Sequence, residues 1–152
     1  MTVAFPPLTL FSENVVAVLI AAMLGAAIGA EREWRRHPGG LRSSALVASA
    51  AAVFARICDA HGMSNPAAGY GAIATGVGFL GAGVIMHTGP QVRGLSTAAT
   101  FWAVAAIGAA AGIFEYGMAV TLTFVVFFAH VALRPLSAWI ERVAPPEDAG
   151  PK

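Results

Sequence analysis

Charged residues are scarce in this 152-residue chain, where Asp, Glu, Lys and Arg together make up 11% of the sequence, against about a quarter in soluble proteins. The formal net charge is +1, so no broad basic or acidic field exists to attract nucleic acid. The single cysteine, Cys58, excludes an internal disulfide and a cysteine-rich zinc site. We interpret Cys58 as a small packing residue, and we expect neither a cofactor nor a nucleic-acid partner.

Catalytic residue sets are also missing. No Ser-His-Asp or Cys-His combination and no cluster of metal-binding residues can be assembled from the sequence, and hydrolytic or metal-assisted chemistry depends on such sets. We therefore predict that the chain is not an enzyme. Asp59, His61 and Glu115 are interpreted as solvated loop residues, although the carboxylates of Asp59 and Glu115 are ligands of the kind that Mg²⁺ prefers, so direct binding of Mg²⁺ stays open.

Long apolar runs dominate what remains, with 57% hydrophobic residues and a mean hydropathy of +0.71. A helix needs about 20 residues to cross a bilayer, and five runs near that length are bounded by charge, Pro or Gly. The first of them is predicted to begin after Ser12 as N-cap and to stay in the mature protein, because the first fifteen residues lack the features of a signal peptide. The sequence predicts an all-α polytopic membrane bundle over residues 1–143, with a flexible tail at 144–152. The predicted spans are 15–30, 41–58, 67–86, 96–114 and 117–133, the last ending at Arg134 and Pro135.

The basic residues predict how the spans are oriented. Lys and Arg in short loops stay on the cytoplasmic side, and eight of the nine basic residues fit an amino terminus outside and a carboxyl terminus inside. Only Arg56 falls on the other side. We therefore expect a multi-pass protein of the bacterial inner membrane.

Small residues form the second pattern. Gly25 and Gly29 make a GxxxG pair, a spacing that lets membrane helices approach closely. The run Gly76, Gly78, Gly81 and Gly83 contains a GxGxxG pattern, but it lies inside an apolar span rather than after a strand, so nucleotide binding is not expected. We interpret these glycines as smooth helix-packing surfaces or as a break whose carbonyls line a pore. Trp102, inside the fourth span, is expected to pack.

The densest charge cluster closes the first span with Glu31, Arg32 and Glu33, followed by further arginines up to Arg42. Glu31 and Arg35 are four residues apart and can pair on one helix face. Two interpretations stay open, an interfacial anchor that sets topology or a functional polar site, because charges held against a membrane bundle often mark function.

Polar residues inside the later spans are few. His130 in the fifth span is interpreted as a packed neutral imidazole rather than a proton relay. Thr75, Thr97 and Thr100 are expected to bond to carbonyls of their own helices.

Four segments in order resemble the MgtC/SapB family of bacterial inner-membrane proteins. They are residues 25–33, 40–47, 76–86 and 92–102, the last including Arg93, Thr97 and Trp102. The resemblance implies a five-span membrane domain associated with growth in low Mg²⁺, with virulence and, in some members, with modulation of other membrane machines such as ATP synthase.

The chain departs from the family pattern at two places. Relatives usually carry an Asp-Pro-Ser-Arg segment and a later Gln where this chain has Asn65, Ala68 and Ala72, so a charge pair is lost unless Arg56 or Asp59 replaces it. Many relatives also have a cytoplasmic carboxyl-terminal domain that we do not expect here.

These observations support a membrane factor that binds other membrane proteins, or a second copy of itself, and thereby alters cation or energy homeostasis. The alternative is an oligomeric transporter or channel for Mg²⁺ or monovalent cations, with the glycines lining the pore. The expected functional polar cluster is Glu31, Arg32, Glu33, Arg42 and Arg93.

Overall fold

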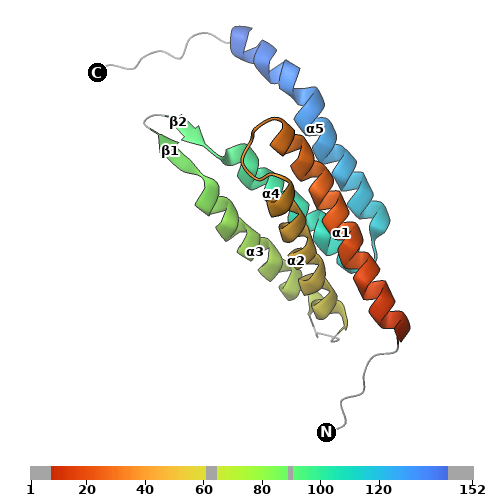
Figure 1. Cartoon of the computed structure of the whole chain (residues 1–152). Coiled ribbons are helices and arrows are strands. Elements are labelled where there is room, and N and C mark those ends of the chain that lie inside the picture. Colours follow the sequence, from red (N-terminus) through yellow and green to blue (C-terminus); the bar gives the residue numbers. More distant parts are fainter. Residues whose placement is uncertain (1–7, 61–64, 89–90, 144–152) are drawn as a thin grey trace.

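The computed structural model describes residues 8–60, 65–88 and 91–143, which form a helical bundle with one short β-hairpin (Figure 1). Five helices in these ranges are long and apolar enough to cross a membrane, so the predicted all-α membrane fold is confirmed. The predicted orientation stays a prediction, and His61 and the predicted tail 144–152 lie outside the described residues. The elements are α1 (Leu8–Trp34), α2 (Leu41–Ala60), α3 (Pro66–Val84), β1 (Met86–Thr88), β2 (Gln91–Arg93), α4 (Leu95–Gly112) and α5 (Tyr116–Val143).

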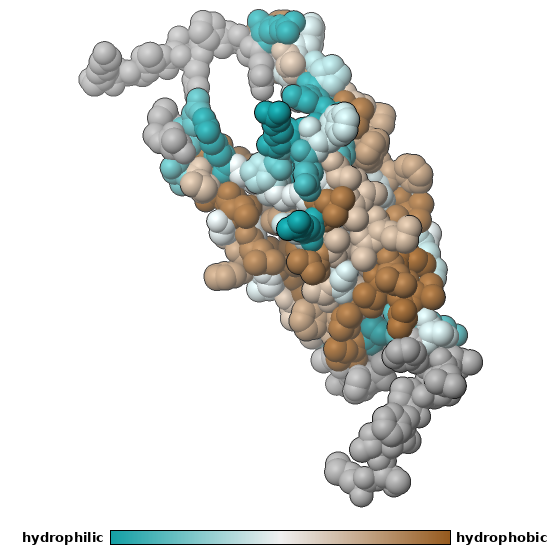
Figure 2. Space-filling model, viewed as in Figure 1, coloured by the Kyte–Doolittle hydropathy of each residue, from teal (hydrophilic) through white to brown (hydrophobic). Residues whose placement is uncertain are grey.

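Helix α4 occupies the centre of the bundle and packs against all four other helices. In Figure 1, α1 and α2 run antiparallel in front of it, and α3 and α5 lie on opposite flanks. Residues such as Val104 and Ile107 of α4 are completely buried, whereas Met23, Phe79 and Phe124 on the outer helices are exposed. Figure 2 shows apolar surface along the side of the bundle. This distribution suits a bundle whose sides are solvated by lipid rather than by water.

One end of the bundle is polar. The α1–α2 loop, the β1–β2 hairpin and the carboxyl end of α5 lie together there (Figure 1), and hydrophilic surface gathers around them (Figure 2). We term this the hairpin end. The hairpin pairs Met86 with Arg93 and His87 with Val92, so the third helix ends at Val84, before the predicted end of its span at residue 86.

Glycines hold α2 tightly between its two main neighbours. A Cβ added at Gly25 of α1 would lie under 3.0 Å from the side chain of Ala48 in α2, and one added at Gly29 would meet the backbone of Gly40 and Leu41. From the other side, a Cβ added at Gly108 of α4 would also lie under 3.0 Å from the backbone of Ala48. Small residues therefore set the spacing of α1, α2 and α4, as membrane helices without a hydrophobic driving force require.

Two helices end in the same six-residue motif, with an unusual residue in the left-handed position. At the end of α1, His37 N–H donates to the Arg32 carbonyl and Arg36 N–H to the Glu33 carbonyl, while Arg36 has φ +58°. Phe114, with φ +66°, has the matching position after α4. This is the Schellman pattern, in which glycine is the usual left-handed residue, so both sites carry backbone strain.

Two predicted boundaries are wrong. Helix α1 begins at Leu8, so Ser12 lies inside it and is not its N-cap, and α5 continues past Pro135 to Val143. Proline removes a single backbone donor, and the hydroxyl of Ser137 donates to the nearby carbonyl of Leu133 at 3.1 Å. At about 1.5 Å per residue, the 28 residues of α5 are longer than the bilayer core, and the carboxyl end of this helix projects past its neighbours in Figure 1.

Candidate functional site: a buried arginine and a carboxylate–histidine pair

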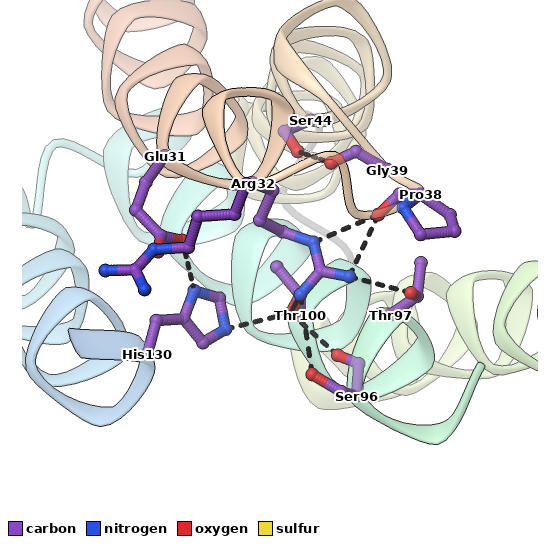
Figure 3. Close-up of polar contacts among 10 residues, drawn as sticks. Glu31, Arg32, Pro38, Gly39, Ser44, Ser96, Thr97, Thr100 and His130 are labelled. Atoms are coloured by element: carbon purple, nitrogen blue, oxygen red, sulfur yellow. Dashed lines mark hydrogen bonds and ion pairs between the residues drawn. The ribbon is translucent and has the colours of Figure 1, made fainter. Parts of the chain in front are cut away.

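The buried centre of the site is the guanidinium of Arg32, a residue only 3% exposed and placed between the α1–α2 loop and the start of α4 (Figure 3). Its Nε and one Nη donate to the carbonyl of Pro38 at 3.0 and 2.9 Å. The Nη atoms also donate to the hydroxyls of Thr97 at 2.7 Å and Thr100 at 3.1 Å, with a longer bond of 3.4 Å to Ser96. A guanidinium has five N–H donors, so these bonds use all of them. Arg32 therefore fastens the loop to α4, and its guanidinium is not exposed at the surface.

Glu31 points toward α5 instead. Its Oε1 is ion-paired with Arg35, the partner that their four-residue spacing predicted. Its Oε2 lies 3.2 Å from Nδ1 of His130, whose Nε2 lies 3.1 Å from the hydroxyl of Thr100 (Figure 3). One continuous polar network thus joins α1, α4 and α5 at the hairpin end.

The hydrogen-bond roles in this network require a proton between Glu31 and His130. The Thr100 hydroxyl accepts from Arg32 and has one proton, which it can give to the Ser96 carbonyl, 2.7 Å away, or to His130. If Ser96 receives it, His130 must donate through Nε2, and a second proton is needed between Nδ1 and the Glu31 carboxylate. If His130 receives it, the single imidazole proton sits on Nδ1 and faces Glu31. In either arrangement, a proton lies between Nδ1 of His130 on α5 and the carboxylate of Glu31 on α1.

Glu33 contacts the start of α2 rather than the network around His130. Its Oε2 accepts a hydrogen bond from the backbone N–H of Leu41 at 2.9 Å, which is the first residue of α2. The first N–H groups of a helix have no partner within the helix, and a carboxylate there also interacts favourably with the helix dipole. Glu33 thus caps α2.

The remaining members of the predicted polar cluster are not brought into the network. Arg42, in the first turn of α2, and Arg93, on β2, are both exposed. Neither lies within bonding distance of Glu31 or Arg32 among the described contacts. Of the five predicted residues, Arg32 is buried, Glu31 is partly buried, and Glu33, Arg42 and Arg93 are exposed.

The glycines of α3 lie in an unbroken helix, so the interpretation of this run as an unwound pore segment is wrong for this structure. Gly81 packs on α4, where an added Cβ would lie 3.3 Å from that of Ala98. Positions 76, 78 and 83 instead face open space, with nothing within 4 Å of an added Cβ. Trp102, expected to pack, is 56% exposed.

The opposite end of the bundle holds a smaller polar group around Arg56. Its guanidinium donates to Asn14 at 2.7 Å and to Asp59 at 2.8 Å, and lies 4.6 Å from the centre of the Phe114 ring. Asp59 lies in the last turn of α2 rather than in a loop, whereas its predicted exposure to solvent is confirmed. Arg56 therefore ties α1 and α2 to the turn that follows α4.

Sequence reasoning missed the parts played by His130 and the α4 hydroxyls. The Thr100 hydroxyl does bond to the carbonyl of Ser96, as expected. It also accepts a hydrogen bond from Arg32 and lies next to Nε2 of His130. A usable signal was present, because Ser96, Thr97 and Thr100 fall on one side of a helix whose other residues are apolar. Within the described ranges, no group of three or more His, Cys, Asp or Glu side chains is placed to hold a metal ion.

Comparison with models of protein families matches the MgtC family over residues 18–139. Protein MgtC of Salmonella typhimurium is 43% identical over 129 residues, which cover 85% of this chain and 56% of that protein. Protein MgtC of Brucella abortus is 41% identical over 122 residues, covering 80% and 51%, and an uncharacterized protein of Synechocystis sp. is 40% identical over 132 residues, covering 86% and 56%. The chain thus spans about half the length of the curated relatives it matches. Comparison with solved structures gave no match.

Proposed function

The chain belongs to the MgtC family, and on that premise we propose that it is a non-enzymatic factor of the bacterial inner membrane that supports adaptation to low Mg²⁺. It acts by contacting other membrane proteins or a second copy of itself. Relatives that carry the name MgtC support the connection to Mg²⁺. The membrane-spanning bundle supports action within the bilayer.

The observation that carries the proposal is the open outer surface of α3. Gly71 and Gly78 are seven residues apart, as are Gly76 and Gly83, so each pair lies in one row along the helix. None of the four has a heavy atom within 4 Å of an added Cβ. A glycine inside a helix costs roughly 0.5–1 kcal/mol relative to alanine, and no contact within the described chain offsets that cost. In lipid, such rows are where the backbone of another helix can approach closely.

The polar network at the hairpin end also supports a non-enzymatic role. All donors of Arg32 are used within the chain, and both oxygens of Glu31 are engaged by Arg35 and His130. The network therefore holds the hairpin end in one arrangement rather than offering a free catalytic group. Arg42 and Arg93, which face outward, are among the exposed charges that a partner could contact at that end.

The alternative, an oligomeric transporter for Mg²⁺ or monovalent cations, has weaker support. The middle of the described bundle is filled by a buried apolar cluster that includes Ala48, Val104 and Ile107, so ions would need a route between chains. Flux of Mg²⁺, K⁺ or H⁺ into liposomes above that of empty vesicles would favour this alternative.

Substitution on α3 tests the main proposal. We expect Gly76→Leu to leave the chain folded in the membrane but to abolish recovery of its cross-linked partner and growth in low Mg²⁺ of a strain lacking its own copy. Gly117→Leu is the matched control, because Gly117 lies on α5 and is equally open. Full complementation by Gly76→Leu, or equal losses in both variants, would overturn the role of α3.

A further inference from the structure

A hollow at the hairpin end lies outside the proposed partner surface. It measures about 310 Å³ and opens between α1 and α5. The charged residues and histidines of its lining are Glu31, Arg32, Arg35, His37, His130 and Arg134. The volume is ample for a phosphate-sized group.

The lining of the hollow carries an excess of positive charge. Three arginines face one glutamate, which gives a formal charge of +2 with the histidines neutral. The only carboxylate in the lining is already committed, since one oxygen of Glu31 pairs with Arg35 and the other faces His130. The buried guanidinium of Arg32 is held by neutral oxygens alone among its described contacts. The hollow therefore has positive charge that no described carboxylate balances.

The cationic groups differ in how free they are to bind a ligand. Arg32 has no donor left, so it contributes charge but no contact. Arg35 engages Glu31 through Nε, which leaves its Nη atoms for another acceptor. Arg134 is exposed at the rim and has no ion pair or hydrogen bond among the described contacts. Arg35 and Arg134 thus approach the hollow from α1 and α5 and can bind the same anion.

The depth of the hollow matches the lipid headgroup region. Trp34, next to Arg35, is 90% exposed, and indole rings favour the membrane–water interface. Leu133 of the lining is exposed on α5. A lipid whose phosphate entered the hollow would direct its acyl chains toward the bilayer centre, along the exposed apolar residues of α5 that precede Leu133.

We infer that this hollow binds a phosphoryl anion, with Arg35 and Arg134 as donors. Arginine suits this role because its planar guanidinium can bond two phosphate oxygens at once, and basic pockets between membrane helices are suited to anionic headgroups. The anion comes either from an anionic phospholipid or from free phosphate. This inference does not depend on the proposed function.

The test is thermal unfolding of the full chain, purified in mild detergent and stripped of lipid. Three probes are titrated separately: phosphatidylglycerol, zwitterionic phosphatidylcholine and inorganic phosphate. We expect phosphatidylglycerol to raise the unfolding midpoint and phosphatidylcholine to have little effect. A rise with inorganic phosphate alone would support the site and identify free phosphate as the source, whereas no rise with either anion would overturn it.

A comparison of Arg134→Gln with Arg42→Gln distinguishes anion binding in the hollow from general attraction to surface charge. Both arginines are exposed, and only Arg134 lines the hollow. We expect Arg134→Gln to weaken the response to the anion about tenfold, the effect of losing one charge-assisted hydrogen bond, while Arg42→Gln responds like the unmodified chain. Equal weakening in both variants would overturn the inference, and unchanged circular dichroism of Arg134→Gln shows that it still folds.

Discussion

The Nδ1 atom of His130 lies 3.2 Å from Oε2 of Glu31, which joins α5 to α1 across 99 residues of sequence. Both side chains are largely buried, at 18% and 10% exposure. Because α5 lies on the flank of the bundle, this contact and the neighbouring one to Thr100 are the polar links that hold it at the hairpin end.

A double-mutant cycle measures this link. We expect Glu31→Gln and His130→Gln each to lower the free energy of unfolding, and the double variant to lose less than the sum, with a coupling of about 1 kcal/mol or more. Unfolding by denaturing detergent in mixed micelles gives the required free energies. Glu31→Gln combined with Arg42→Gln is the control pair, for which additivity is expected. Additive losses for Glu31 and His130 would show that the contact contributes nothing.

Replacement of Arg32 by lysine keeps the positive charge but removes the guanidinium group. Lysine has three donors, so at least two of the five hydrogen bonds are lost. At about 1 kcal/mol for each bond, we expect the free energy of unfolding to fall by about 2 kcal/mol. Arg42→Lys, at an exposed position, should leave it unchanged. An equal stability of the two variants would contradict the structural role of Arg32.

Substitution by glycine should stabilise the chain at one of the two left-handed residues and not at the other. Arg36→Gly relieves a strained φ of +58° at an exposed position, and we expect a gain of about 1 kcal/mol in the free energy of unfolding. Phe114→Gly relieves a similar strain but removes the ring that contacts Arg56 and Tyr116, so no gain is expected. Thermal unfolding of both variants checks this, and a loss of stability in Arg36→Gly would disprove the assignment of strain.

Alanine substitutions at Gly108 and Gly76 distinguish a glycine packed against a neighbouring helix from a glycine with no neighbour. At Gly108 the new methyl group would lie under 3.0 Å from the backbone of Ala48, and we expect a loss of about 1–3 kcal/mol from overpacking. At Gly76 it meets nothing within 4 Å, so the better helix propensity of alanine should add roughly 0.5–1 kcal/mol. Measured unfolding free energies that shift in the same direction would contradict the packing described for α2 and α4.

The number and approximate position of the helices could be predicted because crossing a bilayer is a local requirement. Each span depends on about 20 consecutive apolar residues, and the charges that bound them are visible in the sequence. Helix ends were less predictable. Pro135 suggested a stop, yet α5 continues, because beyond the bundle a single missing hydrogen bond is tolerated.

The site was predictable only in outline. The cluster from Glu31 to Arg42 was identified as the most polar part of the chain, but Arg32, Arg35 and Arg42 look alike in sequence. One proves buried, one paired and one free. His130 was interpreted as a packed imidazole because its partner lies on a helix far away in the chain.

Hydropathy, length and charge placement along the chain were enough to establish a five-helix membrane bundle with a polar loop after the first helix. The roles of Arg32, Glu31 and His130 depended on how the helices pack, since their partners on other helices lie 30 or more residues away. The rotation and register of each helix set those contacts. They follow from glycine contacts such as that of Gly108 with Ala48, where steric fit between backbones decides which side chains meet, and hydropathy carries no information about that fit.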